Sequence, residues 1–527
     1  MFCPKYAGVR IAGMRSFGAD ACTPYYKFCG LRGYRTSASA HRLPGGLADA
    51  VIVRNLYQGP KNMRILLMSP RNPIGQHTSS WLRIPQLSLS VLAGLTPPGH
   101  DITIIEEEFE SPPSTEHWDL VGMTTMTANS ARAYRFARRF QECGAKVVLG
   151  GVHPSVLPDE ASKHADAIVI GEAEGVWEQV VSDAQHNRLQ QVYRNMQPDL
   201  SKSPFPVRKT PRRIFGLPPY VMPIMSTRGC AYNCEFCCVH RLYGHKARHV
   251  PIQHIVSDIS RNEPKLIMLL DDNIGADRAY SLALFEAFRP LRKQWCGQAT
   301  TRFILDEDLF TAAVRSGLRA VFIGVETIEQ EARTGLRKSL GTMREYDEAV
   351  RRCRAAGVLF HASLIFGLDD QTPRVFERTL DFLARNSVPS ISANILTPYP
   401  GTQLFDRLKR ENRLLHTNWT YYDHQTVCFQ PKNMSMEELG ERHLAFCREY
   451  LSWSSIIRRL PAQWGNMPLL YLGMNLAMRR SVTHLMNRRR DYLRWLRNQR
   501  TSEPPDTPME TESVPDDTLP VEATQAV

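Results

Sequence analysis

Two stretches of the chain alternate short apolar runs with longer segments of helical periodicity. In the first stretch, residues 63–185, Ala133, Phe136, Ala137 and Phe140 recur at helical spacing, and Gly144 supplies a stop. This pattern predicts a helix between two apolar runs. Short apolar runs that alternate with helices are typical of a parallel, doubly wound sheet. The runs of the first stretch are residues 65–68, 102–105, 120–123, 146–149 and 167–170.

The second stretch, residues 220–420, repeats the alternation of strands and helices. One of its helices opens with the capping box Thr342–Glu345 and closes at Gly357. Six strand–helix units in a row predict a partial (β/α)6 barrel of the TIM type. The predicted strands are residues 221–227, 266–270, 298–301, 320–325, 358–366 and 391–396. The fold class is therefore α/β, with a doubly wound domain followed by a partial barrel.

The remaining segments lack this alternation. Residues 186–219 are polar and rich in proline, so they predict a linker, and residues 421–500 predict a helical C-terminal region. The Arg-rich residues 1–62 are interpreted as an extension that is disordered or arises from a misplaced start codon, with a transit-like peptide as the alternative. The acidic residues 501–527 predict a disordered tail.

Composition places the chain among multidomain globular proteins. A length of 527 residues with 43% hydrophobic residues excludes both a small scaffold and wholesale disorder. No apolar run is long enough for a membrane span. Twelve cysteines are too few for a disulfide scaffold in a chain of this length, which favours reduced thiols and a cytoplasmic location.

The net charge of +12 is unevenly distributed, because the tail after residue 500 carries acidic residues and neither Lys nor Arg. The rest of the chain is therefore more basic, which suits an anionic ligand, nucleic acid or a membrane surface. Net charge alone does not distinguish among these three. Residues 468–497 form a basic amphipathic segment. We interpret it as a helix with a solvated outer face, and an interfacial membrane helix is the alternative.

The most specific signal is the cysteine motif Cys230, Cys234 and Cys237, directly after the first predicted barrel strand. A four-iron cluster normally takes four cysteine ligands, so three thiolates leave one iron open for a substrate or cofactor. Cys238 is interpreted as an ordinary neighbouring thiol. Structural zinc completed by the histidines of residues 240–254 is the alternative, although these histidines lack ligand-like spacing.

The spacing CxxxCxxC, with Phe236 before the last cysteine, resembles the signature of the radical S-adenosylmethionine (SAM) superfamily. The resemblance implies that Cys230, Cys234 and Cys237 hold a [4Fe-4S] cluster, that they form the catalytic centre, and that the open iron chelates SAM. It also implies that the reduced cluster cleaves SAM to methionine and a 5′-deoxyadenosyl radical.

Polar residues recur at the carboxyl ends of the predicted barrel strands, where barrel active sites gather. In the family these ends hold the SAM amino group and ribose, although the usual Gly-Gly-Glu is replaced by residues 271–273. Strand-end caps and salt bridges are the alternative for any single residue. The residues expected to bind SAM, together with Phe236, are Asp271, Asp272, Asn273, Arg302, Glu326 and Gly367.

In the first domain, Thr125 and the glycines Gly150, Gly151 and Gly171 follow predicted strands, where glycine permits close approach of a ligand. Together with the cysteine motif, this layout resembles the cobalamin-binding domain fused to many radical SAM enzymes. The resemblance implies that these residues bind cobalamin. Residues 70–77 lack the Asp-x-His-x-x-Gly that supplies a lower cobalt ligand in other cobalamin proteins. A nucleotide-binding or structural role for the domain is the alternative.

The leading interpretation is a cobalamin-dependent radical SAM enzyme that methylates an unactivated carbon. A cyclase, rearrangement or oxidation enzyme with the same cofactors is the first alternative, and a non-catalytic cobalamin or iron–sulfur sensor is the second. We expect a small-molecule, lipid or peptide substrate, a reductant such as flavodoxin or ferredoxin, and no nucleic acid. Peripheral membrane contact would accompany a lipid substrate.

Overall fold

The structure is a computed structural model that describes residues 62–74, 84–112, 117–208, 221–329, 341–460 and 468–501. The described residues belong to one compact unit. The predicted N-terminal extension, apart from residue 62, and the predicted acidic tail, apart from residue 501, lie outside the described residues. So does part of the segment that was expected to be a linker.

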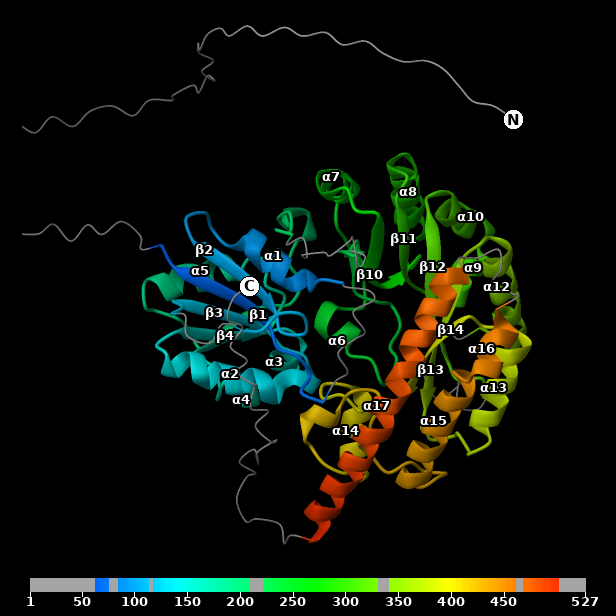
Figure 1. Ribbon diagram of the computed structural model, residues 1–527. Helices are drawn as coiled ribbons and strands as arrows, with labels where there is room; N and C mark the ends of the chain where they lie inside the picture. The colour runs from blue at the N-terminus through cyan, green and yellow to red at the C-terminus, as the bar shows by residue number, and fades with distance from the viewer. Residues whose placement is uncertain are drawn as a thin grey trace, which may run out of the picture. The chain divides into compact units, whose positions relative to one another are not determined.

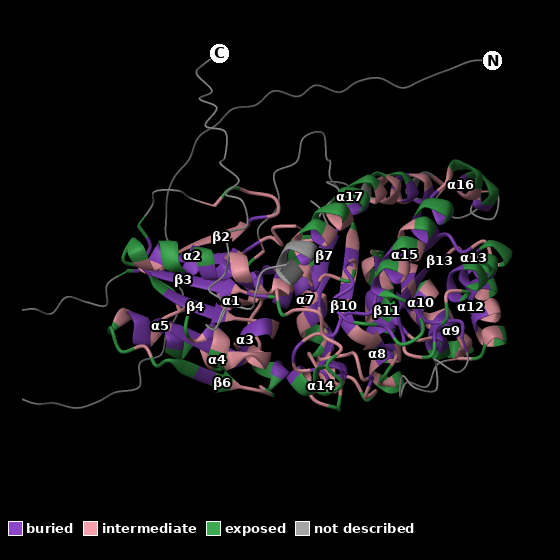
Figure 2. Cartoon of the chain, turned by 90° about the horizontal axis from the view of Figure 1, so that it is seen from below, coloured by how far each residue is buried: buried purple, intermediate pink, exposed green. Residues whose placement is uncertain are grey.

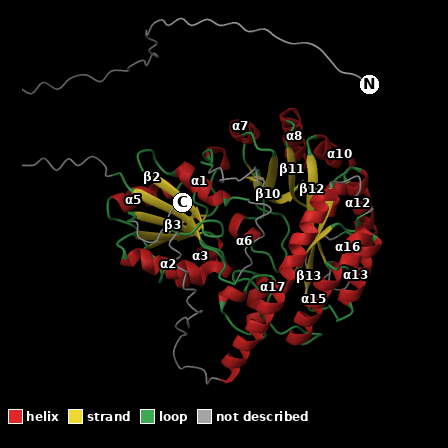
Figure 3. Cartoon of the chain, in the orientation of Figure 1, coloured by secondary structure: helices red, strands yellow, loops and turns green. Residues whose placement is uncertain are grey.

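The first sheet is parallel throughout, with strand order β2-β1-β3-β4-β5-β6, and helices pack on both of its faces (Figures 1 and 3). The order reverses at β1, and ligands of doubly wound sheets bind at such a switch point. Its strands are β1 (Arg64–Ser69), β2 (Asp101–Glu106), β3 (Leu120–Thr124), β4 (Lys146–Gly150), β5 (Ala167–Gly171) and β6 (Val192–Asn195). Its helices are α1 (Leu87–Leu95), α2 (Ser130–Glu142), α3 (Val152–Val156), α4 (Pro158–Ala161) and α5 (Trp177–Gln185).

Strand β6 is an element that the sequence did not predict. It lies within the segment expected to be a linker, yet it pairs in parallel with β5, so that Val169 lies opposite Tyr193. Only Tyr193 of this strand is buried, while Val192 remains 41% exposed. A four-residue strand with one buried side chain has too little alternation to stand out in the sequence.

The second sheet is also parallel, with strand order β14-β13-β12-β11-β10-β7, and it forms the predicted partial barrel. Its strands are β7 (Val221–Ile224), β10 (Leu266–Ile274), β11 (Gln294–Ala299), β12 (Leu318–Glu326), β13 (Leu359–Phe366) and β14 (Ser390–Ile395). Its helices include α7 (Ile252–Asn262), α8 (Arg278–Phe288), α9 (Thr301–Leu305), α10 (Glu307–Arg315), α12 (Met343–Ala355) and α13 (Val375–Arg385). Figure 2 shows these strands as largely buried.

The third barrel strand was predicted too late in the sequence. It was expected at residues 298–301, whereas β11 spans Gln294–Ala299 and Thr301 already begins α9. The strand is anchored by Trp295, which is 1% exposed and whose indole donates a hydrogen bond to Ser316 Oγ at 3.0 Å. Gly297 and the exposed Gln298 interrupt the apolar run, so the sequence pattern does not reveal its true start.

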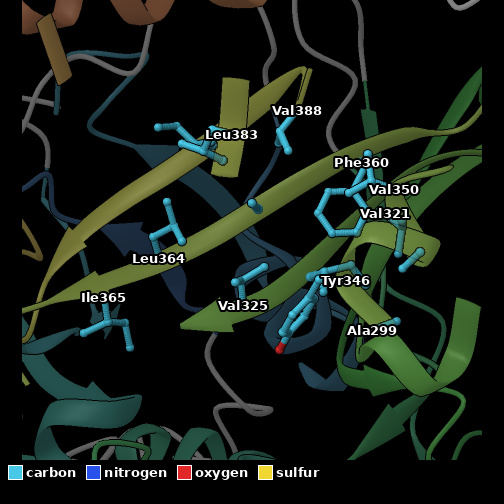
Figure 4. Close-up of a cluster of buried hydrophobic side chains, with 14 of the residues drawn as sticks. Ala299, Val321, Val325, Tyr346, Val350, Phe360, Leu364, Ile365, Leu383 and Val388 are labelled. Carbon is cyan, nitrogen blue, oxygen red and sulfur yellow. The ribbon is translucent and has the colours of Figure 1, made fainter. Parts of the chain in front are cut away.

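Helix α12 illustrates how local signals and packing agree. The predicted capping box is present, because the Glu345 amide donates to Thr342 Oγ1 at 3.2 Å and the Glu345 carboxylate accepts from the Thr342 amide. Tyr346 and Val350 follow on the buried face of the helix. Figure 4 shows them beside Val321 and Phe360 of the barrel strands, in the largest hydrophobic core.

The C-terminal region is helical, as predicted, with α15 (Met436–Tyr450), α16 (Trp453–Arg459) and α17 (Pro468–Thr501), and α14 (Gln403–Arg410) precedes it. Helix α17 buries Leu485, Tyr492 and Leu496, whereas Arg480 and Arg490 are exposed. Tyr492 fixes the helix to the loop before α15 by donating a hydrogen bond to the Val427 carbonyl at 2.7 Å. Among the described helices, none combines the length and apolar character that a membrane crossing requires.

Candidate active site

The cysteine loop lies between two short strands, β8 (Thr227–Arg228) and β9 (Arg248–His249), which pair antiparallel. Cys234 is buried, and Cys230 and Cys237 are half-buried. Burial raises the pKa of the Cys237 thiol to about 12, and the nearby Cys238, Cys234 and Asp272 add to this effect. A thiolate in this environment needs a bound cation to be stable, and the iron of a cluster would supply it. The donor set therefore fits an iron–sulfur cluster.

The cysteine loop is anchored to the start of α14, far away in the sequence. The Glu235 carboxylate accepts a hydrogen bond from Arg407 Nε at 2.5 Å, and the Glu235 carbonyl accepts one from the Leu404 amide at 3.0 Å. The Gln403 side chain also donates to Asn233 Oδ1 at 3.0 Å. Residues between the cysteines thus hold the loop in place, and their role was not predicted because their partners lie in another element.

The arrangement differs from a site for a single metal ion. Among the described residues, no group of three or more His, Cys, Asp or Glu side chains could hold one metal ion. A structural zinc site needs such a group. An iron–sulfur cluster, by contrast, would be held by the cysteine thiolates alone. Cys238 directly precedes α6 (Val239–Tyr243), and its side chain makes no capping hydrogen bond there.

The acidic residues at the end of β10 have different surroundings. Asp271 is 3% exposed and accepts hydrogen bonds from the Ser226 amide and from Thr227 Oγ1, both at 2.7 Å, so it fixes the turn before the cysteine loop. Burial raises the pKa of Asp272 to about 6. Among the described residues, the buried Oδ1 of Asn273 has no hydrogen-bond partner, so it has the capacity to accept one from a bound group.

Glu326 ends β12 in a conformation that few non-glycine residues adopt. Its φ is +60° and its side chain is buried at 6% exposure. The register between β12 and β13 shifts at this point, between Gly324 and Glu326. Strained backbone of this kind concentrates at functional sites. Together with Asp271, Glu326 lines a cavity of about 280 Å³ inside the barrel.

Asp272 and Asn273 are not among the described residues that line this cavity, and three further residues expected to bind SAM also lie outside it. Arg302 lies on the exposed side of α9. Gly367 has φ +99°, and a Cβ atom there would lie 2.9 Å from Leu439 Cδ2, so its small size serves the packing of α15. Phe236 packs against the barrel core. None of the three is among the described residues that line the barrel cavity.

A second cavity, of about 360 Å³, opens at the carboxyl ends of β3, β4 and β5. Gly150, Gly151 and Gly171 line it as expected, whereas Thr124 and Met126 do so in place of the neighbouring Thr125. Gly151 has φ +98°, and a Cβ atom there would lie 2.9 Å from the Thr125 amide nitrogen. The glycines thus keep this apolar cradle open for a large ligand, which fits cobalamin. Residue 77, the last of the segment that lacks the cobalt-ligand motif, lies outside the described residues.

The glycine-lined cavity is shared by the two domains. Arg228, Tyr243 and Leu270 of the barrel region line it together with residues of the first sheet. This proximity brings the end of strand β8, two residues before Cys230, to the ligand cavity of the first domain. The sequence alone does not reveal that these barrel residues line the cavity of the first domain.

Two arginines and two glutamates join the domains beside this cavity. Arg228 donates to Glu172 at 2.5 Å and to Glu174 at 2.7 Å, and Arg248 donates to Glu172 at 2.5 Å. Arg228 and Arg248 are cross-strand neighbours, and Glu172 lies between their charges. The side chains are 2% to 18% exposed. We call this group the interdomain clamp.

Burial opposes ionisation of the clamp carboxylates. Burial is the largest single effect on the pKa of Glu174 and would raise it, but the charge and hydrogen bond of Arg228, together with a backbone hydrogen bond and the charge of Arg248, lower this pKa overall. Glu174 is therefore ionised, and it needs Arg228 to remain so. The clamp residues were not predicted, although Glu172 and Glu174 lie in a glycine-bounded loop after a strand, which is a signal that could have pointed to them.

These features define an iron–sulfur protein in which a doubly wound ligand-binding domain faces a partial barrel. Comparison with known families gives the same answer, since residues 224–383 match the radical SAM superfamily and residues 84–181 match the B12 binding domain. The chain therefore combines a B12 binding domain with a radical SAM domain that follows it. The cofactors that these two domains imply are a [4Fe-4S] cluster, SAM and cobalamin.

Curated relatives include bacteriochlorophyllide d C-12(1)-methyltransferase of Chlorobaculum tepidum, 28% identical over 76% of this chain and 90% of the relative. Hopanoid C-2 methylase of Rhodopseudomonas palustris is 25% identical over 63% of this chain and 66% of the relative. Among solved structures, the radical SAM methyltransferase TsrM of Kitasatospora setae aligns with a TM-score of 0.62 at 14% identity, covering 80% of this chain and 99% of TsrM. The likeness to TsrM supports the fold alone.

Proposed function

We propose that the protein is a cobalamin-dependent radical SAM methyltransferase that transfers a methyl group to an unactivated carbon by way of a 5′-deoxyadenosyl radical. The observation that carries the proposal is the shared cavity, in which the strand leading to Cys230 meets the glycine cradle of the first domain. The curated relatives over most of the chain, which are named methyltransferases, support the same reaction.

In this function, the bound cluster would supply the electron for SAM cleavage and cobalamin the methyl group. The residues of the chain would bind these groups and orient them. Cys230, Cys234 and Cys237 hold the cluster, and Asn273 and Glu326 offer oxygens to SAM at the strand ends. Gly150 and Gly151 let cobalamin approach the first sheet. Burial between the two domains excludes water from the reacting groups.

An oxidative or ring-forming reaction with the same cofactors is the second candidate. One specific observation favours it: the anaerobic magnesium-protoporphyrin IX monomethyl ester cyclase of Rubrivivax gelatinosus is 23% identical over 74% of this chain and 77% of the relative. The two candidates share SAM cleavage and differ in whether a methyl group reaches the product. Transfer of a deuterated methyl group from labelled SAM to a small molecule separates them.

The partners follow from the reaction class. We propose a small-molecule, lipid or peptide substrate and an external reductant such as flavodoxin or ferredoxin, in a cytoplasmic setting. The exposed arginines of α17, including Arg480 and Arg490, suit contact with an anionic membrane surface if the substrate is a lipid.

The experiment that tests the enzyme class is anaerobic reconstitution with iron, sulfide, cobalamin, SAM and a reductant. We expect release of 5′-deoxyadenosine, which Cys234→Ala abolishes because the cluster loses one of three ligands. Cys238→Ala is the matched control, since it removes a neighbouring thiol outside the motif, and it should retain iron and activity. Absence of 5′-deoxyadenosine from the wild-type protein, or equal activity of Cys234→Ala, would contradict the proposal.

A further inference from the structure

Exposed apolar side chains gather on two helices of the C-terminal region. Among the described residues, seven large hydrophobic side chains are exposed, and four of them belong to α16 and α17. These four are Trp453 at 53%, Ile457 at 63%, Leu476 at 38% and Met486 at 40%. Single exposed apolar residues are ordinary on a protein surface, whereas a group of them indicates a site of interaction.

The two helices pack against each other, so their exposed sides belong to one surface (Figures 1 and 2). Tyr471 of α17 donates a hydrogen bond to the Ile456 carbonyl of α16 at 2.8 Å. The guanidinium of Arg479 lies over the Trp453 ring, with its central carbon 5.1 Å from the ring centroid. Because Arg479 is within one helical turn of Leu476, this contact joins the exposed ring to the exposed side of α17.

Arginines lie on the same surface. Residues 451–500 contain ten arginines, no lysine and one acidic residue, Asp491. The exposed Arg480, Arg490 and Arg494 follow Leu476 by whole numbers of helical turns and therefore share its side of α17. Arg494 pairs with Asp491 at 3.5 Å, but both side chains are exposed and such a pair is weak. The surface therefore keeps a strong positive charge.

We call this set of residues the α16–α17 surface. It consists of Trp453, Ile457, Leu476, Met486, Arg480, Arg490 and Arg494. The opposite side of α17 is used by the fold, because Leu485, Tyr492 and Leu496 are buried there. The helix thus meets a partner with its outer side alone. Since no described helix could cross a membrane, a lipid partner would be contacted from outside the bilayer.

The combination of side chains favours an anionic lipid surface as the partner. Arginine beside tryptophan and aliphatic residues is typical of surfaces that lie at the boundary between headgroups and acyl chains. Tryptophan suits this boundary because its ring is apolar and its N–H is polar. Nucleic acid would match the charge but binds through bases stacked on aromatic rings. Arg479 covers the Trp453 ring, and the other apolar residues of the surface have no ring.

We propose that the α16–α17 surface docks the protein on an anionic lipid bilayer. Trp453, Ile457 and Leu476 enter the headgroup region, and the arginines of α17 contact the lipid phosphates. The partner is the bilayer itself, whatever acceptor the enzyme methylates. The inference therefore goes beyond the proposed function and does not depend on it.

Vesicle sedimentation of the reconstituted full chain tests the proposal. One set of vesicles contains phosphatidylcholine alone, and the other contains phosphatidylcholine and phosphatidylglycerol in equal parts. We expect the protein to sediment with the mixed vesicles and to stay in the supernatant with phosphatidylcholine. Added salt should weaken the binding because it screens the arginines from the lipid charges.

Two variants separate the apolar and the charged contributions. A protein with both Trp453→Ser and Ile457→Ser should bind the mixed vesicles about tenfold more weakly. Arg480→Glu together with Arg490→Glu should also weaken binding about tenfold, and this loss should disappear at high salt. Leu476→Ser replaces the first variant if loss of the Trp453 contact lowers the thermal unfolding midpoint.

The matched controls lie in the first domain. Val192→Ser removes an exposed apolar side chain from β6, and Arg138→Glu reverses an exposed charge on α2. Both controls should bind the mixed vesicles like the wild type. Equal binding by the folded variants of α16 and α17 would therefore overturn the proposal.

Three further outcomes also overturn it. They are wild-type protein that ignores the mixed vesicles, equal binding to phosphatidylcholine alone, and a dimer or an oligothymidylate complex that forms through this surface in place of vesicle binding. Release of 5′-deoxyadenosine is measured in the same samples without vesicles, and the surface variants should retain it. Its absence from the wild-type protein would refute the proposed function and leave the docking surface standing.

Discussion

At the scale of single residues, burial decides the chemistry more than residue type does. Asp271 and Asp272 are adjacent, yet the Asp271 carboxylate accepts hydrogen bonds from Ser226 and Thr227 at 2.7 Å, while the Asp272 carboxylate accepts a longer one from the Gly229 amide at 3.3 Å. Buried histidines show the same principle. His361 and His443 both have pKa values lowered to about 4 by burial, so each is neutral near pH 7.

The pKa of His361 predicts a pH dependence of stability. An unfolded histidine titrates near about pH 6.5. Because the folded pKa is about 4, the unfolded chain binds a proton that the folded chain does not bind between these values. The stabilising contribution is complete above about pH 6.5 and is lost as the pH falls toward about 4, by at most about 1.4 kcal/mol per pH unit.

His361→Gln should therefore flatten the decline of the thermal unfolding midpoint between about pH 7 and about pH 5.5, because glutamine does not titrate in this range. Intrinsic tryptophan fluorescence of the anaerobic protein follows the transition. Part of the decline of the midpoint with falling pH remains in both proteins, because His443 and the other buried histidines still titrate. Parallel curves for the variant and the wild type would exclude this contribution of His361.

At the scale of elements, helix termini were the features that local sequence predicted best. The capping box of α12 and the helix around Ala133 both form as expected, since each depends on residues within a few positions of one another. The start of β11 was missed because it depends on the packing of Trp295 against Ser316 in another element.

The cap of α12 gives a prediction for element stability. Thr342→Ala removes the side-chain oxygen that accepts from the Glu345 amide, and we expect it to lower the free energy of unfolding by about 1 kcal/mol. Thr342→Ser retains the oxygen and should stay close to the wild type. Chemical unfolding curves measure both. An equal loss in the two variants would mean that the methyl group, rather than the cap, stabilises this terminus.

At the scale of the whole molecule, the interdomain clamp connects the two cofactor domains. Arg228→Met removes the cationic partner that Glu172 and Glu174 share. Loss of one member of a buried ion pair lowers the free energy of unfolding by about 3–5 kcal/mol. We expect a lower unfolding midpoint and less cobalamin retained per chain, measured by absorbance after gel filtration.

Arg351→Met is the matched control, because it breaks the exposed pair with Glu348, and exposed ion pairs contribute little to stability. Equal behaviour of the two variants would show that the clamp does not hold the cobalamin cavity together.

The sequence by itself determined the cysteine motif, the alternation of strands and helices, and the glycines after β4 and β5. Each of these is encoded over a few neighbouring residues, by ligand spacing, side-chain period or backbone freedom. Tertiary structure alone decided which of the expected residues face a cavity. It leaves Arg302 exposed and places Thr124 and Met126, rather than Thr125, at the glycine-lined cavity. It also brings Arg228 into contact with Glu172. Such pairings join residues far apart in the chain, and only the packing of whole elements fixes them.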